Sequence, residues 1–209
     1  MQLTLRTEAK AEVVQARDAL ETLNKTLQPF AMQDGLTGLA NRRQFDLALG
    51  EACDRAAQDG SSLALILMDV DCFKRFNDTY GHIFGDACLR TIGQTVAALT
   101  PGHAGVLAAR YGGEEIVLLL PDTDKDGAVV VAETVRHAIR DLRIVHSGNV
   151  GGFVTLSAGV DASAPSAVGG AASDLVAAAD KALYAAKAAG RDQVCVSLGK
   201  AVLSGAALA

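Results

Sequence analysis

Cysteine and histidine are scarce in this chain of 209 residues, and neither occurs in a pattern typical of disulfides or metal centres. No C-x-x-C pair is present, and the cysteines stand in apolar or helical surroundings. We therefore expect buried free thiols in a reducing compartment rather than disulfides or a zinc site. The histidines lack metal-ligand spacing. The residues concerned are Cys53, Cys72, Cys88 and Cys195, and His82, His103, His137 and His146.

The chain also lacks an apolar run of membrane-spanning length and an excess of positive charge. Its net charge of −5 argues against non-specific binding to nucleic acid or to an anionic membrane, but a local basic patch could still bind a phosphorylated small ligand. Met1 is followed by a polar segment of mixed charge, so no signal peptide is visible. We expect a cytoplasmic protein; if the chain is a fragment, a membrane anchor could lie upstream.

The first 30 residues contain no glycine, and Pro29 is their only proline. Apolar residues recur there at intervals of seven in two series offset by three, which is the a/d pattern of a coiled coil. We expect residues 1–31 to form a helix that joins two copies of the chain, ended or kinked by Pro29. A single amphipathic helix packed on the following domain is the alternative. The two series are Val13, Leu20 and Leu27, and Ala9, Ala16, Leu23 and Phe30.

Strand-like and helix-like segments alternate over residues 32–197, which we interpret as one domain followed by a tail at 198–209. Apolar runs bounded by turn residues predict strands, and amphipathic spacing predicts helices. The alternation favours an α/β fold of the α+β sandwich type, with a central, mainly antiparallel sheet and flanking helices. Strands are expected at 62–71, 105–111, 116–121, 152–162 and 193–198, and helices at 86–99, 124–142 and 173–190.

Two pairs of acidic residues stand beside predicted strands. Asp69 and Asp71 end the run at 62–71, and Glu114 and Glu115 follow a glycine pair at the tip of a predicted hairpin. Carboxylates that meet repel one another, and a hard divalent cation such as Mg²⁺ removes that conflict. The glycines permit positive φ and leave room for a phosphate. Asp69 and Glu114 are therefore candidate Mg²⁺ ligands, with solvated acids and an ordinary Gly-Gly turn as the alternatives.

The stretch after this first acidic pair gathers cations, amides and glycines. Lys74 and Arg75 could meet phosphates. Asn77 and Asp86 could bind the edge of a base, because a carboxylate that accepts two N–H groups suits guanine. Helix capping is their alternative role. A later pair of cations, four residues apart at a helix end, suits either phosphate binding or the helix dipole; these are Lys187 and Arg191.

Four motifs, in this order, resemble a GGDEF domain of the diguanylate cyclase family. They are "DGLTGLANRR", "LILMDVDCFKRFNDTYGHIFGD", "RYGGEEIVLLLP" and "ADKALYAAKAAGRD", and the resemblance spans about residues 32–196. It implies a palm-like sheet similar to that of nucleotidyl cyclases and polymerases. It also implies a reaction in which two GTP molecules condense to cyclic di-GMP and release two pyrophosphates. Each protomer of a face-to-face homodimer would hold one GTP.

The resemblance implies a role for each matching residue. Asp69 and Glu114 match the metal carboxylates, with the backbone carbonyl of Val70 as a further ligand, for two Mg²⁺ ions per active site or Mn²⁺ as an alternative. Glu114 is also the family's usual proton acceptor, and Glu115 matches a position near the metal or the attacking hydroxyl. Lys74 matches the lysine that stabilises the transition state. The implied substrate contacts are Asn77, Asp86 and His82, the backbone amides of Cys72 and Phe73 near the phosphates, and Lys187 and Arg191 at the terminal phosphates.

The sequence departs from the family pattern at two places. The signature reads G-G-E-E-I, whereas the commoner form ends in Phe. Ile116 should begin the core strand, and an apolar exchange there is tolerable, so we expect activity to survive. The family's product-inhibition site, an R-x-x-D just upstream, is replaced by His103 and Val106. Without the cationic fork and its acid, phosphate binding should be weak, and we expect no feedback inhibition through that site.

Two other functions compete with an active diguanylate cyclase. One is a catalytically degenerate module that binds GTP or a protein partner, and the intact metal and base positions count against it. The other is a different palm-type nucleotide cyclase or polymerase-like enzyme, against which Asn77 and Asp86 favour guanine. Because the reaction needs two half-sites, a coiled coil would favour catalysis by raising the effective concentration of the second half-site.

Overall fold

The computed structural model describes residues 32–100, 102, 105–163 and 171–197. The chain divides into two compact units, Met1–Gln33 and Asp34–Ala209, and nearly all described residues belong to the second. The predicted coiled coil and C-terminal tail, together with His103, lie outside the described residues. None of the helices described is both long and apolar enough to cross a membrane.

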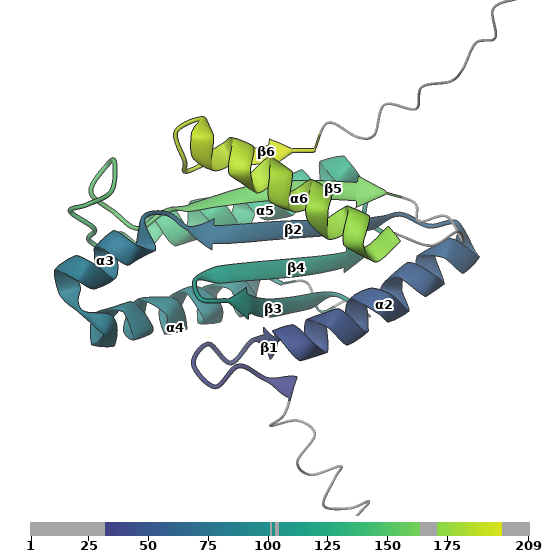
Figure 1. Cartoon of the computed structure of the whole chain (residues 1–209), viewed down its shortest axis with the longest axis horizontal. Coiled ribbons are helices and arrows are strands. Elements are labelled where there is room, and N and C mark those ends of the chain that lie inside the picture. The colour runs from purple at the N-terminus through teal and green to yellow at the C-terminus, as the bar shows by residue number, and fades with distance from the viewer. Residues whose placement is uncertain (1–31, 101, 103–104, 164–170, 198–209) are drawn as a thin grey trace, which may run out of the picture. The chain divides into compact units, whose positions relative to one another are not determined.

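Six strands form one mixed sheet in the order β1-β3-β4-β2-β5-β6 (Figure 1). The four inner strands pair antiparallel, whereas the short edge strands β1 and β6 pair parallel to their neighbours. The expected mainly antiparallel sheet is therefore confirmed. The strands are β1 (Ala40–Asn41), β2 (Leu63–Val70), β3 (Leu107–Gly112), β4 (Glu115–Pro121), β5 (Leu156–Ser163) and β6 (Val194–Val196).

Helices cover both faces of this sheet and give the fold three layers (Figure 1). Two helices, α2 and α6, pack on one face, and α3, α4 and α5 pack on the other. Each face therefore has its own apolar core. The helices are α2 (Arg42–Asp59), α3 (Phe73–Tyr80), α4 (His82–Leu99), α5 (Lys125–Asp141) and α6 (Ala171–Ala188).

Strand β2 lies between β4 and β5 and is buried on both faces. Successive side chains of a strand point to opposite faces, so a strand between two cores needs apolar residues at every position. Ala64, Ile66 and Met68 enter the core beneath α3, α4 and α5. Leu65 and Leu67 enter the core beneath α2 and α6. This arrangement explains the uninterrupted apolar run seen in the sequence.

The structure differs from the sequence prediction just after β2. The helix that was expected to begin at residue 86 begins at His82, and an additional helix, α3, precedes it. Gly81 separates the two with φ 86° and ψ 158°, a conformation that non-glycine residues rarely adopt. The buried rings of Phe73 and Phe76 anchor α3 on the core. At the other end of the chain, α6 begins two residues earlier than predicted.

Candidate active site

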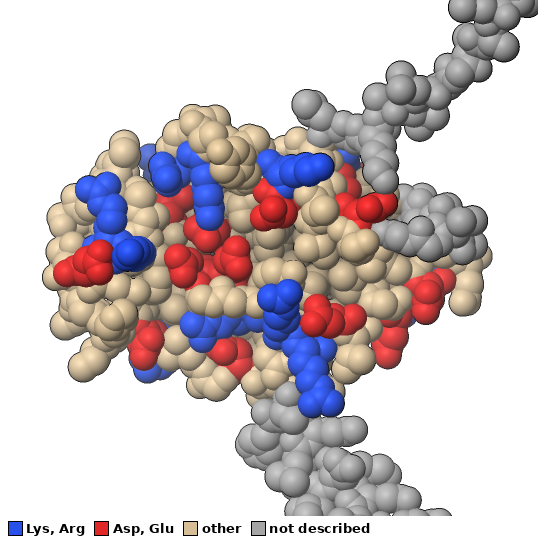
Figure 2. Space-filling view, viewed as in Figure 1, with Lys and Arg blue, Asp and Glu red and all other residues tan. Residues whose placement is uncertain are grey.

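The site begins where β2 ends, because three neighbouring strands bring polar residues together there. Asp69 lies opposite Glu115 of β4 and opposite Ser157 of β5. Like charges directly opposite on adjacent strands destabilise a sheet. The Asp69 side chain is only 12% exposed, so water screens it little. Figure 2 shows acidic side chains gathered near this strand end, with basic side chains around them.

Lys187, near the end of α6, reaches this acidic pair and places its Nζ 2.9 Å from Asp69 Oδ2. Burial raises the pKa of Asp69; Lys187 opposes that rise, and the charges of Glu114 and Asp71 add to it. Burial also raises the pKa of Glu115, and Asp69 is the next cause. Both carboxyl groups thus retain a raised pKa although Lys187 is present. Burial, rather than neighbouring charge, is the largest cause of both shifts.

The turn between β3 and β4 presents Glu114 beside the pair. Gly113 has φ 51°, and the β3–β4 register shifts between Arg110 and Gly112. Arg110 Nε donates to the Gly113 carbonyl at 2.8 Å, and its Nη1 lies 3.1 and 3.2 Å from the two carboxylate oxygens of Asp34. Arg110 therefore fastens the turn to the loop that precedes β1. Sequence reasoning assigned no role to either Arg110 or Asp34, although both lie inside the quoted motifs.

Asp71 would share a face with Asp69 only if the strand continued, and β2 ends at Val70. The Asp71 side chain is buried, with 1% of the residue exposed. Its carboxylate accepts hydrogen bonds from Thr155 Oγ1 and Ser157 Oγ, both at 2.7 Å, and from the backbone N–H of Asp192 at 3.1 Å. Asp71 comes after the last residue of β2, so the two-residue alternation of the strand no longer places it on the face of Asp69.

The segment that follows turns sharply into α3. Cys72 has φ 56°, which is rare for a residue other than glycine, and Phe73 opens the helix. The first amide groups of α3 are therefore free of intrahelical partners, which is the usual state of a helix start. The ring of the buried His146 meets the Cys72 carbonyl through Nε2 at 3.2 Å, while Nδ1 accepts from the Gly148 N–H at 3.3 Å. Nε2 is thus the protonated nitrogen that donates to Cys72.

The residues predicted to bind a base lie on α3 and α4. Asn77 Oδ1 is buried and has no hydrogen-bond partner among the described residues. It lies beside Gly85, where an added Cβ would come within 1.9 Å of it. A buried, unsatisfied amide oxygen is uncommon and calls for an explanation such as an absent ligand. The side chains of Asp86 and His82 are exposed at the start of α4, on the same helix pair.

The remaining predicted cations are placed differently from one another. Lys187 contacts Asp69 directly, as described above. Arg191 is exposed on the turn after α6 and has φ 67°. Lys74 and Arg75 are exposed on the first turn of α3. Lys187 alone among these cations makes a salt bridge to the acidic pair in the part of the chain that is described.

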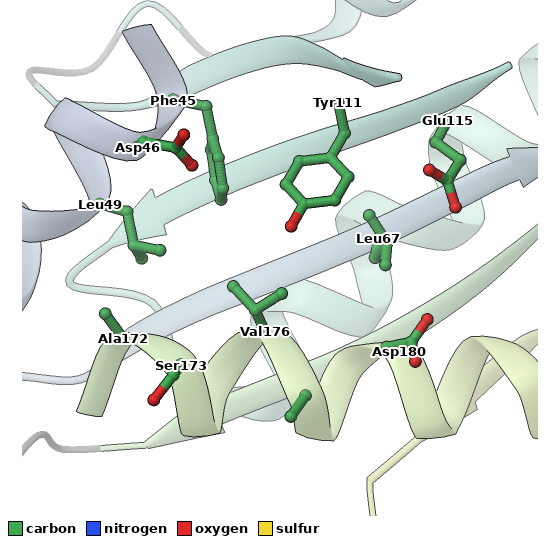
Figure 3. A pocket seen from close by; sticks show the side chains of 11 residues that line it. Phe45, Asp46, Leu49, Leu67, Tyr111, Glu115, Ala172, Ser173, Val176 and Asp180 are labelled. Carbon is green, nitrogen blue, oxygen red and sulfur yellow. The ribbon is translucent and has the colours of Figure 1, made fainter. Parts of the chain in front are cut away.

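A cavity of about 580 Å³ opens on the α2–α6 face and ends at Glu115. Figure 3 shows Glu115 and Asp180 at one end and the apolar side chains of Phe45 and Leu49 at the other. A smaller cavity of about 290 Å³ adjoins Glu115 and Lys187. Sequence reasoning missed this apolar cavity, because its walls come from helices that are far apart in the chain.

The oxygen-rich composition of the site fits a hard divalent cation. In the residues that the structure covers, no three His, Cys, Asp or Glu side chains converge closely enough to hold an ion by themselves. Mg²⁺ does not need such a cage, since it is usually bound by one or two carboxylates together with substrate phosphates. Burial is the largest cause of the raised pKa values of Asp69 and Glu115, and the charges of neighbouring carboxylates add to it, so a cation in the site would favour their charged forms. Fold and site together describe an α+β protein with acidic side chains and one lysine gathered at the end of its central strand.

Comparison with known proteins identifies the class more closely. Residues 31–193 match the family described as "Diguanylate cyclase, GGDEF domain". The response regulator PleD of Caulobacter vibrioides is 39% identical over 165 residues, which cover 78% of this chain and 36% of PleD. The diguanylate cyclase VdcA of Vibrio cholerae is 37% identical over 188 residues, which cover 89% of this chain and 52% of VdcA. This chain therefore belongs to the GGDEF family of diguanylate cyclases, as its four motifs predicted.

Solved structures confirm the predicted fold. The GGDEF domain of DgcB from Caulobacter crescentus, in complex with c-di-GMP, has a TM-score of 0.71 at 34% identity, covering 79% of this chain and 93% of that one. The coiled coil and GGDEF domain of the same protein, also with c-di-GMP, has a TM-score of 0.75 at 31% identity, covering 94% of this chain and 100% of that one. Diguanylate cyclases of this family are generally metal-dependent. The chain matches only 36% and 52% of the lengths of PleD and VdcA.

Proposed function

We propose that the chain condenses two GTP molecules into cyclic di-GMP and releases two pyrophosphates, with Mg²⁺ ions in the active site of each protomer of a homodimer. The observation that carries the proposal is the opposed pair Asp69 and Glu115, two carboxylates that adjacent strands place together, with Lys187 in a salt bridge to Asp69. Such a site is unfavourable alone and becomes favourable when a divalent cation and phosphates enter together.

The carboxylates of Asp69 and Glu114 would hold the metal, and the backbone carbonyl of Val70 would supply a further oxygen. When bound, Mg²⁺ stabilises negative charge on the phosphate that reacts. Lys187 now occupies the position beside Asp69. We infer that it leaves this carboxylate for the terminal phosphates when nucleotide and metal bind.

Guanine would bind between α3 and α4. The unsatisfied oxygen of Asn77 would accept from the base, and the Asp86 carboxylate would accept from its N–H edge. His82, exposed at the start of α4, would contact the nucleotide from the side. This pairing of an amide with a carboxylate favours guanine over adenine, because adenine does not present two adjacent donors.

The phosphates would lie between the start of α3 and the end of α6. The backbone amides of Cys72 and Phe73 would donate to them from one side, and Lys187 and Arg191 would bind the terminal phosphates from the other. Lys74 would stabilise the charge that develops in the transition state.

Each chemical step forms one bond between a 3′ oxygen and an α-phosphorus and breaks the α–β phosphoanhydride bond, so that pyrophosphate leaves. Two such steps close the ring. The proton of the 3′ hydroxyl passes to a carboxylate on the β3–β4 turn, for which Glu114 is the first candidate. The raised pKa of the adjacent Glu115 suits a group that orients or accepts this proton.

A homodimer is required because each protomer would hold one GTP. The predicted coiled coil at 1–31 would bring two domains together and raise their effective concentration. Product feedback through the family's inhibitory site should be weak. Val106 packs against the apolar core, so this position offers a phosphate no charge.

The proposal is tested by incubating the full chain with GTP and Mg²⁺ at several protein concentrations and separating the products by chromatography. We expect cyclic di-GMP, a rate per protomer that rises with protein concentration until dimerisation is complete, and no effect of equimolar ATP. Added cyclic di-GMP should leave the initial rate unchanged. Strong non-competitive inhibition by product would contradict the feedback prediction alone.

Two variants sharpen this assay. Asp69→Asn should abolish turnover, because it removes a metal carboxylate while keeping the shape of the side chain. Asp126→Asn also removes one negative charge, but from the first turn of α5, and should leave turnover unchanged. A verified dimer of the unmodified chain that forms no product would instead favour a degenerate module that binds GTP or a protein partner.

A further inference from the structure

The turn after α6 holds three consecutive residues with positive φ: Gly190 at 121°, Arg191 at 67° and Asp192 at 46°. Glycine adopts such values readily, but arginine and aspartate do so at a cost. Residues in sparsely populated backbone regions persist only where the surrounding structure forces them, and they cluster at functional sites. We therefore expect neighbouring groups to hold this turn in its conformation.

Two buried side chains form hydrogen bonds with Asp192. Arg136 of α5, with 8% of the residue exposed, donates through Nη1 to Asp192 Oδ1 at 2.7 Å and to its backbone carbonyl at 3.2 Å. The carboxylate of Asp71 accepts from the Asp192 backbone N–H at 3.1 Å. A third group, Arg140, contacts Asp192 Oδ2 at 3.0 Å but is 57% exposed. Buried charge-assisted bonds constrain geometry far more than an exposed ion pair does.

Asp71 also belongs to the other segment that would face the phosphates. It directly precedes Cys72, the N-cap residue of α3, which has a left-handed backbone conformation. Thr155 and Ser157 fix its carboxylate from β5 and the residues just before it. The buried carboxylate of Asp71 therefore links two segments with left-handed backbone, one at Cys72 and the other at Arg191 and Asp192.

We propose that Asp71 and Arg136 are positioning residues that hold the Arg191 turn and the start of α3 at the separation a nucleotide triphosphate tail needs. This inference rests on the proposed function, because it takes Arg191 and the Cys72–Phe73 amides as phosphate contacts. Neither Asp71 nor Arg136 touches the nucleotide. Arg136 acts through Asp192, and Asp71 acts through Asp192 and through the chain that leads into Cys72.

A role in stability alone would have a different consequence from a role in positioning. If the Arg136–Asp192 contact only joins α5 to the end of α6, its loss should change the affinity for every ligand by the same factor. If the contact instead orients Arg191 toward the β and γ phosphates, its loss should weaken the binding of ligands that carry those phosphates and leave the affinity for a monophosphate unchanged. The ratio of triphosphate to monophosphate affinity therefore separates the two roles.

The test compares Arg136→Met with Arg140→Met in the full chain, since both arginines contact the same carboxylate and differ in burial. Binding of α,β-methylene GTP, whose α–β bridge cannot be cleaved, and of GMP is measured by titration calorimetry with Mg²⁺. We expect Arg136→Met to weaken binding of the triphosphate analogue about ten-fold or more and to leave GMP within about two-fold. Arg140→Met should leave both within about two-fold.

Equal weakening of the analogue and GMP, or an unchanged analogue affinity in folded Arg136→Met, would overturn the inference. If Arg136→Met fails to fold, Asp192→Ala and Asp192→Asn serve instead. Alanine removes the contacts and disfavours positive φ, whereas asparagine tolerates positive φ and can still accept from Arg136. We expect the triphosphate advantage to fall in the first and to persist largely in the second; equal ratios would overturn the inference. If the unmodified chain does not bind the analogue more tightly than GMP, the proposed phosphate site itself is refuted. If the unmodified chain prefers the analogue and the variants keep the same preference, only the positioning role of Asp71 and Arg136 is refuted.

Discussion

Replacing Arg110 should loosen the β3–β4 turn, and the structure allows the size of the effect to be worked out. Arg110 Nη1 lies 3.1 and 3.2 Å from the carboxylate oxygens of Asp34, and both side chains are about one-fifth exposed. Hydrogen bonds to charged groups contribute about 1.5–3 kcal/mol, and fully exposed pairs about 0.2–1 kcal/mol. The Arg110–Asp34 pair lies between these two cases, so we expect its coupling free energy to be about 1–2 kcal/mol.

The assay is a double-mutant cycle of Arg110→Met and Asp34→Asn, followed by thermal and urea unfolding. For a chain of this size each kcal/mol moves Tm by about 2–4 °C, so Arg110→Met should lower Tm by roughly 2–8 °C. It should also lower turnover, because Arg110 Nε holds the carbonyl of Gly113 beside the acidic pair. Arg43→Met, on the exposed side of α2, is the matched control and should do neither.

The coupling should also depend on pH in a defined direction. Burial alone would raise the pKa of Asp34, but hydrogen bonds from Thr37 and the charge of Arg110 outweigh it and bring the pKa below the ordinary value of 3.8. A depressed folded pKa contributes stability above the unfolded value and loses it as pH falls through the folded value. The coupling should thus be complete at pH 7, begin to weaken near pH 3.8 and disappear only as the pH falls through the folded pKa, which lies below that value. A coupling under about 0.3 kcal/mol at pH 7, or one that persists in acid, would refute this reasoning.

Three further changes have defined outcomes. Gly85→Ala would place a Cβ 1.9 Å from Asn77 Oδ1 and displace that side chain, so GTP affinity should fall about ten-fold or more while the fold survives; an unchanged titration would exclude Asn77 as a base contact. Gly159→Ala would bring a Cβ within 2.1 Å of the α6 backbone and should lower the free energy of unfolding, measured in urea, by about 3 kcal/mol or more. In the control Gly50→Ala, the added Cβ meets nothing within 4 Å, so that variant should be neutral or slightly stabilised. Similar urea midpoints for the two variants would contradict this packing. Mg²⁺ at ten times its dissociation constant should stabilise the chain by about 1.4 kcal/mol in a thermal shift assay and not stabilise Asp69→Asn; an equal shift in both would place the ion elsewhere.

Some features of the fold and site follow from local sequence alone. The run that became β2 is apolar at nearly every position because two cores meet at this strand, and that pattern is visible without a structure. The glycine pair between two apolar runs indicated the hairpin, and four motifs in order along the chain indicated the family. The residues themselves paired Asp69 with Glu114, and the family resemblance placed Glu115 near the same metal; the strand register puts Glu115 directly opposite Asp69.

Other features depend on contacts between distant parts of the chain. The turn that holds Arg191 is contacted at Asp192 by Arg136 and Asp71, which lie 56 and 121 residues away from Asp192 in the chain. The inward orientation of Asp71 likewise depends on Thr155 and Ser157. No local pattern contains this information. The early start of α4 was missed because a glycine-rich segment favours a turn in isolation and is overridden by packing.

The pairing of β2 with its neighbours constrains how this site can change over time. Seven residue pairs register β2 with β4, and eight register it with β5. A slip of one residue along either edge would reverse every side chain between the two cores and would move Asp69 away from Glu115. The distance between the acids is thus protected by apolar residues that never touch a ligand. Individual site residues can be exchanged without losing that distance, so a lineage could lose turnover and still keep a nucleotide-sized site intact.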